Sequence, residues 1–260
     1  MIREPKLTLV GAGPGDPELL TLKAVRILAD ADVVLYDALI NPEILGHINK
    51  GAERIFAGKR CGNHYMTQDR INETIVQKAL EGKHVVRLKC GDPFVFGRGH
   101  EELEAANERG IPTEVVLGVS SVSLPGLYGV PLTRRGVNES YWVVTAVTKN
   151  GEVSNDLRLA AQSSATVVIL MGLKRITEIM DIFVTQGKAM TPAAVIGKGS
   201  HPDGEIVSGN VATLAEKVKN SEIPAPAMIV VGEVARNASE VPLDGLYDDY
   251  LIESKSTAYG

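Results

Sequence analysis

The chain has 260 residues, of which 44% are hydrophobic, so it is long enough for one large or two medium globular domains with a substantial core. Its formal net charge of -5 argues against binding nucleic acid through overall positive charge, so an anionic partner would need a local basic cluster. No run approaches the roughly 18 apolar residues of a membrane helix. The N-terminus also lacks the apolar segment of a signal peptide, and we expect a cytoplasmic protein with neither membrane nor nucleic-acid partners. Cys61 and Cys90 lack the paired spacing of metal ligands, so we expect no metal site.

The N-terminal residues predict a strand, a glycine loop and a helix. Residues 6–11 are largely apolar, glycines follow at 11–15, and residues 19–28 have apolar side chains at helical spacing. The loop is close to the G-x-G-x-x-G fingerprint of dinucleotide-binding proteins, but Asp16 stands where that fingerprint needs a small residue. Pro14 also removes a backbone donor, so the loop favours a ligand without phosphates. A non-catalytic module that binds a dinucleotide remains the alternative to an enzyme.

Alternating strands and helices continue through the first half of the chain. The predicted elements are strands over 32–36, 54–57 and 84–88 and a helix over 68–80. This alternation is typical of a parallel sheet, whose ligands lie at the carboxyl ends of the strands. Asp37 follows one such strand and is a candidate acid or base, or else the cap of the next helix. Lys59 and Arg60 put two cations beside the turn after the next strand.

The segment 87–102 is the richest in chemically useful side chains. It joins the carboxyl end of a strand to a predicted helix over 98–109. Its glycines allow close backbone approach, and Pro93 prevents the helix from starting early. Its charged side chains include Asp92, Arg98 and Glu101. Spacing alone leaves two interpretations open, a ligand-binding loop or an ordinary strand-to-helix turn capped by Asp92.

The second half predicts another α/β domain. We expect an N-terminal domain over 1–113, a C-terminal domain over 114–236 and a polar tail over 237–260. The predicted strands of the second half cover residues 141–147, 166–171, 193–196, 205–208 and 228–231. The last two indicate some antiparallel pairing. Before them, Ser120 and Ser121 mark a helix start, where they cap the helix or contact a ligand.

Taken together, several motifs resemble the uroporphyrinogen-III C-methyltransferases of the tetrapyrrole methylase family. They are Gly11-Ala12-Gly13-Pro14-Gly15-Asp16, Tyr36-Asp37, Gly58-Lys59-Arg60, the block from Gly91 to Gly99, and Met171-Gly172-Leu173. The resemblance runs from about residue 6 to residue 234. It implies an α/β enzyme with two domains of the tetrapyrrole methylase type and the active-site cleft between them, usually a homodimer.

The resemblance also implies an activity. The family enzymes use S-adenosyl-L-methionine to methylate uroporphyrinogen III at two ring carbons, which gives precorrin-2 via precorrin-1 and leaves S-adenosyl-L-homocysteine. The product feeds sirohaem, haem d1 or cobalamin synthesis. The alternative within the same family is another precorrin or cobalt-precorrin C-methyltransferase.

The resemblance also implies roles for individual residues, wherever this sequence matches a family motif. The implied cofactor contacts are Pro14, Cys90, Gly91, Asp92, Val95, Ser120, Ser121, Met171, Gly199 and Ala227. Asp37 matches the proton acceptor and Lys59 the proton donor, while Arg98 matches a position considered as base or as substrate clamp. Because arginine is ordinarily protonated, we favour the clamp. The implied substrate contacts, suited to the many carboxylates of the tetrapyrrole, are Arg60, Arg98, Glu101, Arg134 and Arg135.

Some positions depart from the family pattern. Ala38 stands where the family commonly has Arg, and both Cys90 and His100 replace Gly. Arg134 lies in a motif that usually carries His, and Ala146-Val147 replaces a Gly-His pair. These changes affect the implied substrate contacts more than the cofactor loops. They are the reason for keeping the precorrin or cobalt-precorrin C-methyltransferase as an alternative.

Overall fold

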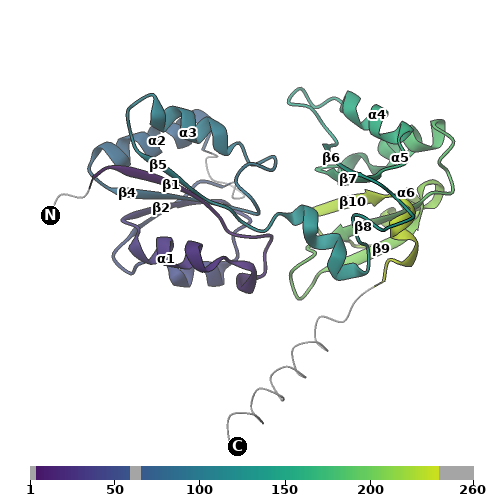
Figure 1. Ribbon diagram of the computed structural model, residues 1–260, viewed down its shortest axis with the longest axis horizontal. Coiled ribbons are helices and arrows are strands. Elements are labelled where there is room, and N and C mark those ends of the chain that lie inside the picture. Colours follow the sequence, from purple (N-terminus) through teal and green to yellow (C-terminus); the bar gives the residue numbers. More distant parts are fainter. Residues whose placement is uncertain (1–3, 59–65, 240–260) are drawn as a thin grey trace, which may run out of the picture. The chain divides into compact units, whose positions relative to one another are not determined.

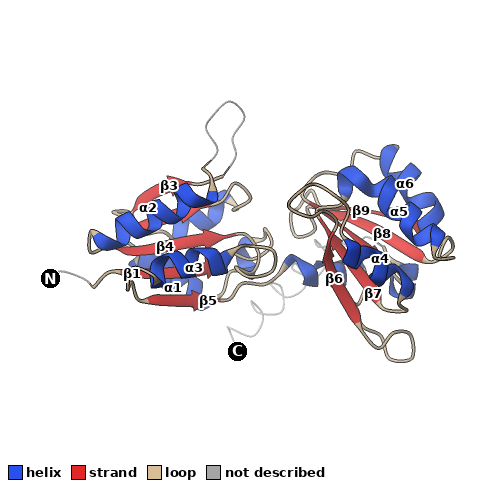
Figure 2. Ribbon diagram, turned by 90° about the horizontal axis from the view of Figure 1, so that it is seen from above, coloured by secondary structure: helices blue, strands red, loops and turns tan. Residues whose placement is uncertain are grey.

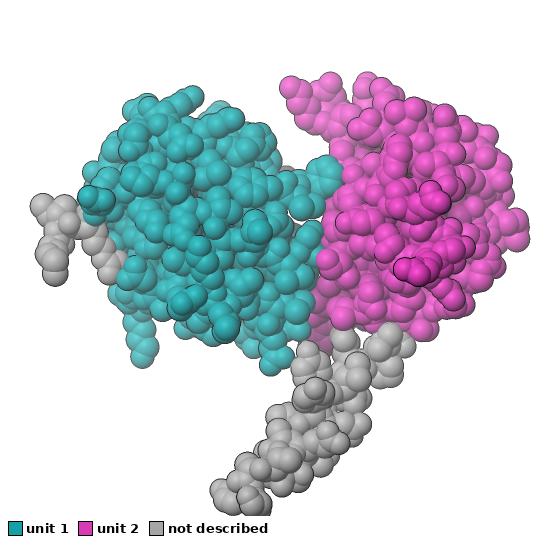
Figure 3. Space-filling model, in the orientation of Figure 1, with its two compact units in different colours: residues 1–121 teal, residues 122–260 magenta. Residues whose placement is uncertain are grey.

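The computed structural model describes residues 4–58 and 66–239 (Figures 1 and 2). Lys59 and Arg60, together with residues 240–260 of the predicted tail, lie outside the described residues. The chain divides into two compact units, Met1–Ser121 and Val122–Gly260 (Figure 3). This division lies C-terminal to the predicted boundary after residue 113, because β5 (Thr113–Val116) pairs with β1 and so belongs to the first sheet.

The first unit contains a five-stranded sheet with the order β3-β2-β4-β1-β5. Every pairing in it is parallel, as the alternation of strands and helices predicted. Its other strands are β1 (Lys6–Gly11), β2 (Val33–Tyr36), β3 (Glu53–Phe56) and β4 (His84–Lys89).

Helices cover both faces of this sheet (Figure 1). On one face, α1 (Leu22–Asp30) buries Ala24 and Leu28 in an apolar cluster with residues of β1, β2 and β4. On the other face lie α2 (Gln68–Leu80) and α3 (Gly99–Asn107), whose buried residues form a second cluster with the sheet. The described part of the unit also contains the 3₁₀ helices Pro17–Leu19 and Pro42–His47.

The second unit contains a mixed sheet with the order β6-β7-β10-β8-β9. Only β6 and β7 pair in parallel; β10 runs antiparallel to β7 and β8, and β8 runs antiparallel to β9. The antiparallel pairing expected for the closing strands is thus confirmed. The strands are β6 (Tyr141–Thr145), β7 (Thr166–Leu170), β8 (Pro192–Gly197), β9 (Glu205–Asn210) and β10 (Ala227–Val231).

Helices α4 (Asn155–Gln162), α5 (Ile176–Thr185) and α6 (Val211–Lys219) pack on one face of the second sheet through a large apolar cluster. The 3₁₀ helix Ser121–Tyr128 packs Leu124 and Tyr128 against the other face. Short 3₁₀ helices follow β7 at Leu173–Arg175 and β10 at Glu233–Asn237. Among the described helices of both units, none has the length and apolar character needed to cross a bilayer.

Candidate active site

The carboxyl ends of β1 and β4 form the topological switch point of the first sheet. The two strands are neighbours, yet α1 and α3, which follow them, pack on opposite faces. Such a point leaves a crevice where ligands bind. The two loops at this point are joined directly, because Gly91 N donates to Gly13 O at 2.7 Å and Gly13 N donates to Gly91 O at 3.3 Å. The glycine loop and the segment after β4 therefore form one continuous backbone surface.

The loop after β5 completes this surface. A Cβ atom placed on Gly118 would lie 2.2 Å from the carbonyl oxygen of Gly91, so only glycine permits this approach. Ser120 follows in the same loop, and Ser121 opens the 3₁₀ helix Ser121–Tyr128, as predicted for a helix start. The structure thus brings the predicted cofactor residues of three loops to one edge of the first sheet: Pro14, Cys90, Gly91, Asp92, Val95, Ser120 and Ser121.

Asp92 does not cap the following helix, so that interpretation is wrong. Its Oδ1 accepts a hydrogen bond from Phe94 N at 2.9 Å and closes a local turn instead. The loop then folds back on itself, and Gly99 N donates to Pro93 O at 3.1 Å. Helix α3 begins at Gly99, preceded by Arg98 in the left-handed conformation.

Left-handed backbone at non-glycine residues is concentrated in the predicted site segments. Four described residues have it: Phe96, Arg98, Met171 and Lys198, with φ between 46° and 60°. Such backbone is energetically costly, and it is frequent at ligand-binding sites. Arg98 and Met171 are themselves predicted site residues, and the other two adjoin Gly97 and Gly199. The loops after β4, β7 and β8 are thus functional candidates on conformational grounds as well.

Asp37 does not cap a helix either. The 3₁₀ helix that follows is capped by Asn41, whose Oδ1 accepts from Glu43 N at 3.0 Å. The carboxylate of Asp37 instead accepts from Nη2 of Arg87, on the neighbouring strand β4, at 2.5 Å. The alternative prediction, that Asp37 caps the next helix, is therefore wrong. The carboxylate of Asp37 is held at the sheet edge where ligands are expected.

Behind Asp37 lies a buried network of charges that the sequence did not predict. Glu102 Oε1 accepts from Arg87 Nε at 3.0 Å and from Lys89 Nζ at 2.9 Å. Burial, reinforced by the charge of Arg87, lowers the pKa of Lys89. For Arg87, burial acts to lower the pKa, but the carboxylates of Asp37 and Glu102 together outweigh it, and the pKa is raised.

Cys90 and His100, two of the departures from the family pattern, point in different directions. The thiol of Cys90 is partly buried, lies 3.9 Å from Gly13 O and packs beside the cluster under α1. Burial, followed by the negative charge of Asp37, raises the pKa of this thiol to about 11. His100 is exposed on the first turn of α3. The cysteine therefore presents a neutral, packed side chain at neutral pH.

Arg98 and Glu101 form a bidentate ion pair at the surface. Arg98 Nε donates to Glu101 Oε1 at 2.7 Å, and Nη2 donates to Oε2 at 2.6 Å. These hydrogen bonds lower the pKa of Glu101. The two predicted substrate residues are thus adjacent and bonded to each other.

In the second unit, three predicted cofactor residues lie at one edge of the sheet. Met171 follows β7, Gly199 lies two residues after β8, and Ala227 begins the antiparallel strand β10 between them. Met171 is more than half exposed, and Ala227 pairs with Gly197. Arg134 and Arg135 are exposed on a turn before β6.

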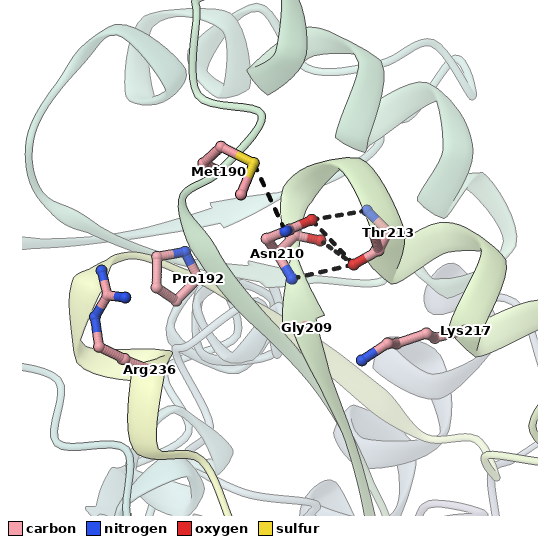
Figure 4. A pocket seen from close by; sticks show the side chains of 7 residues that line it. All are labelled: Met190, Pro192, Gly209, Asn210, Thr213, Lys217 and Arg236. Atoms are coloured by element: carbon pink, nitrogen blue, oxygen red, sulfur yellow. Dashed lines mark hydrogen bonds between the residues drawn. The ribbon is translucent and has the colours of Figure 1, made fainter.

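A surface hollow elsewhere in the second unit contains none of the predicted residues (Figure 4). Asn210 and Thr213, which line it, form the capping box of α6. Lys217 Nζ donates to Ser208 O at 2.8 Å. These polar groups are satisfied within the fold, and we assign no function to the hollow. Within the described ranges, no group of three or more His, Cys, Asp or Glu side chains is arranged to hold a metal ion.

The chain is similar to several known proteins. The family model described as Tetrapyrrole (Corrin/Porphyrin) Methylases matches residues 6–215. A uroporphyrinogen-III C-methyltransferase of Methanocaldococcus jannaschii is 42% identical over 232 residues, which are 88% of this chain and 96% of that protein. A siroheme synthase of Nitrosomonas europaea is 42% identical over 230 residues, which are 88% of this chain but 48% of that protein. The chain thus spans about half the length of the siroheme synthases that it matches.

Solved structures agree with these relatives. A uroporphyrin-III C-methyl transferase from Thermus thermophilus, complexed with S-adenyl homocysteine, has a TM-score of 0.77 and 38% identity, and the match covers 89% of this chain and 99% of that chain. A cobalt precorrin-4 methyltransferase of cobalamin biosynthesis has a TM-score of 0.80 and 29% identity, over 89% of this chain and 96% of that chain. With a family match over most of its length and a relative of nearly equal extent, the chain belongs to the tetrapyrrole (corrin/porphyrin) methylase family.

Proposed function

We propose that this chain is an S-adenosyl-L-methionine-dependent C-methyltransferase that methylates uroporphyrinogen III at two ring carbons, giving precorrin-2 via precorrin-1. One observation carries the proposal: the match to the uroporphyrinogen-III C-methyltransferase of Methanocaldococcus jannaschii extends over nearly the whole length of both chains. The siroheme synthases extend well beyond this chain, so only their matched part supports the assignment.

The loops of the first unit fit a cofactor that has no phosphates. The carboxylate of Asp16 accepts from Glu18 N at 2.8 Å and caps the 3₁₀ helix Pro17–Leu19. It thereby places negative charge at the helix N-terminus where a pyrophosphate would dock. At the same edge, the backbone around Gly11 and Gly118 leaves no room for additional side chains. This argues against the dinucleotide-binding alternative and suits the neutral adenosine and cationic sulfonium of S-adenosyl-L-methionine.

The proposed chemistry assigns roles to the chain's own residues. S-adenosyl-L-methionine, when bound, supplies an electrophilic methyl group on a sulfonium. A pyrrole carbon of the substrate forms the new carbon–carbon bond as the sulfur–carbon bond breaks, and the ring system then loses a proton. We assign Asp37 as the acceptor of that proton, since it is a carboxylate at the binding edge of the sheet. Holding both reactants in line contributes much of the acceleration.

The proposed substrate contacts are cationic. Arg98, with Arg134 and Arg135, would bind the substrate carboxylates, and Arg98 would act as a clamp because its guanidinium already binds the carboxylate of Glu101 bidentately. Lys59 as proton donor and Arg60 as substrate contact remain assignments from the family motif. The proposed cofactor contacts are the ten residues predicted from the sequence.

The proposal extends to assembly, location and pathway. We assign a homodimer, as the family resemblance implies, and we place it in the cytoplasm. The matches to siroheme synthases favour a product used for sirohaem. Sedimentation of the purified protein, which should give twice the chain's mass, tests the dimer.

Anaerobic incubation with uroporphyrinogen III and S-adenosyl-L-methionine, read by mass spectrometry, tests the activity. We expect a product with two added methyl groups. No methyl addition, under conditions in which a known uroporphyrinogen-III C-methyltransferase works, would contradict the proposal. Calorimetry adds an independent result, since tight NAD binding without S-adenosyl-L-homocysteine binding would favour the dinucleotide module instead.

A second candidate is a precorrin or cobalt-precorrin C-methyltransferase. It is favoured by the structural match to the cobalt precorrin-4 methyltransferase and by the departures at Ala38 and His100. Parallel incubations with uroporphyrinogen III and with a cobalt-precorrin separate the two candidates, because methylation of the cobalt-precorrin alone would select the second.

A further inference from the structure

The charged network behind Asp37 is buried except at one end. The side chains of Arg87, Lys89 and Glu102 are 3%, 5% and 0% exposed, whereas that of Asp37 is 30% exposed. The network therefore runs from the interior, between β4 and α3, to a single carboxylate at the ligand-binding edge.

The network interrupts an apolar face of the sheet. Side chains of a strand alternate between its faces, so Val33, Leu35 and Asp37 follow one another on the face covered by α2 and α3. Val85, Arg87 and Lys89 do so on the neighbouring strand, and Leu35 is the register partner of Arg87. The buried valines and Leu35 belong to the apolar cluster, and the charges begin where the strands approach the ligand edge.

Stability does not account for this arrangement. A buried ion-pair network is often no more stable than apolar side chains of similar volume, because desolvation offsets the attraction between the charges. Within the described part of the chain, the buried Oε2 of Glu102 also lacks a hydrogen-bond partner, which is a further cost. The charges therefore call for a role in the site.

The geometry of Arg87 provides such a role. Its guanidinium donates from Nη2 to Asp37, from Nε to Glu102 and from Nη1 to Leu88 O at 3.1 Å. A planar group held at three points cannot rotate freely, and it fixes any carboxylate bonded to it. Lys89 donates to the same oxygen of Glu102, and its positive charge balances the second negative charge of the network.

We propose that Arg87, locked in place by Glu102, is a positioning residue that orients the carboxylate of Asp37 for proton removal. This inference rests on the proposed function, in which Asp37 is the acceptor. Arg87 acts through Asp37 and does not itself contact the substrate or the cofactor.

A double-mutant cycle tests the inference once methylation by the wild-type enzyme has been established. The variants are Arg87→Lys, which keeps the charge but cannot make all three contacts, Asp37→Ala and the double variant. We expect Arg87→Lys to lower kcat about 100-fold, the scale of losses from small misplacements. We expect it to leave the KM for S-adenosyl-L-methionine and the affinity for S-adenosyl-L-homocysteine unchanged. In the Asp37→Ala background, Arg87→Lys should lower kcat no further.

Two further variants separate positioning from stability. Val85→Ala removes buried volume from the same strand and the same face, and it should lower the unfolding temperature without changing kcat. Glu102→Gln keeps the size of the side chain but removes the charge that locks Arg87. It should lower kcat and leave the cofactor affinity unchanged. This variant tests the inference even if the Arg87 variants fold poorly.

Three results would overturn the inference. The first is wild-type turnover by Arg87→Lys, and the second is a parallel loss of kcat and cofactor affinity. The third is a double variant in which the two losses multiply. The failure of the proposed function gives a different result, because the wild-type enzyme would then transfer no methyl group to uroporphyrinogen III.

Discussion

The segment 87–102 of the first unit contributes to two arginine–carboxylate pairs, whose surroundings differ. Arg87 and Asp37 are 50 residues apart in the sequence and meet across neighbouring strands, with the arginine almost fully buried. Arg98 and Glu101 are three residues apart, with side chains 52% and 32% exposed. A buried pair is expensive to break and fixes geometry, whereas an exposed pair exchanges partners readily. The first pair thus suits orientation of a catalytic group, and the second suits reversible capture of a substrate carboxylate.

The largest effect should come from Asp37, at the exposed end of the buried network. Asp37→Ala should lower turnover about 10²- to 10⁴-fold, the usual contribution of a positioned base, and spare S-adenosyl-L-homocysteine binding. Anaerobic turnover assays and calorimetry measure the two quantities. Asp181→Ala removes an exposed carboxylate from α5 and should leave turnover unchanged. Unchanged turnover in Asp37→Ala would remove Asp37 as the base.

The buried network and the exposed Arg98–Glu101 pair should differ sharply in their contributions to stability. Glu102→Ala leaves Arg87 and Lys89 buried without their shared carboxylate and should cost about 3–5 kcal/mol of unfolding free energy. Glu101→Ala breaks only the exposed pair and should cost less than about 1 kcal/mol. Urea unfolding of both variants measures the difference. Equal losses of unfolding free energy would show that burial does not distinguish the network from the exposed pair.

Substrate affinity should depend on the exposed pair. Arg98→Ala should raise the KM for the tetrapyrrole about tenfold, consistent with the loss of one charged hydrogen bond, and leave cofactor affinity unchanged. Arg175→Ala is a matched control, because Arg175 pairs with Glu178 at the same spacing in the second unit. If Arg98→Ala weakens substrate and cofactor equally, a folding defect, and not a lost clamp, is indicated.

The smallest effect concerns another exposed pairing, at the edge of the first sheet. Hydrogen bonds from Lys23 and Lys6 lower the pKa of Glu114 from 4.5 to about 2. The stabilisation is therefore present above the unfolded-state pKa and is lost as the pH falls through the folded-state value. Glu114→Gln should lower the unfolding free energy by about 1 kcal/mol near neutral pH, and less toward pH 2. Urea titrations across this range measure it; a pH-independent loss would show that the charge is not responsible.

The sequence predicted what depends on local pattern. Glycine loops and apolar periodicity located the strands, and the block from Gly91 to Gly99 follows the carboxyl end of β4, as predicted. Three features were missed because they depend on tertiary register: the Arg87–Asp37 bond, the burial of Glu102 between α3 and the sheet, and the pairing of β5 with β1. A local signal did exist for the network, since Arg87 and Lys89 are two cations on one face of an otherwise apolar strand.

Carbon methylation of the tetrapyrrole is tested most directly by nuclear magnetic resonance of the product formed from S-adenosyl-L-methionine with a carbon-13-labelled methyl group. The proposed function predicts two labelled methyl groups, each bonded to a ring carbon of a product derived from uroporphyrinogen III. Label on oxygen or nitrogen, or an unlabelled tetrapyrrole beside an active control enzyme, would contradict it.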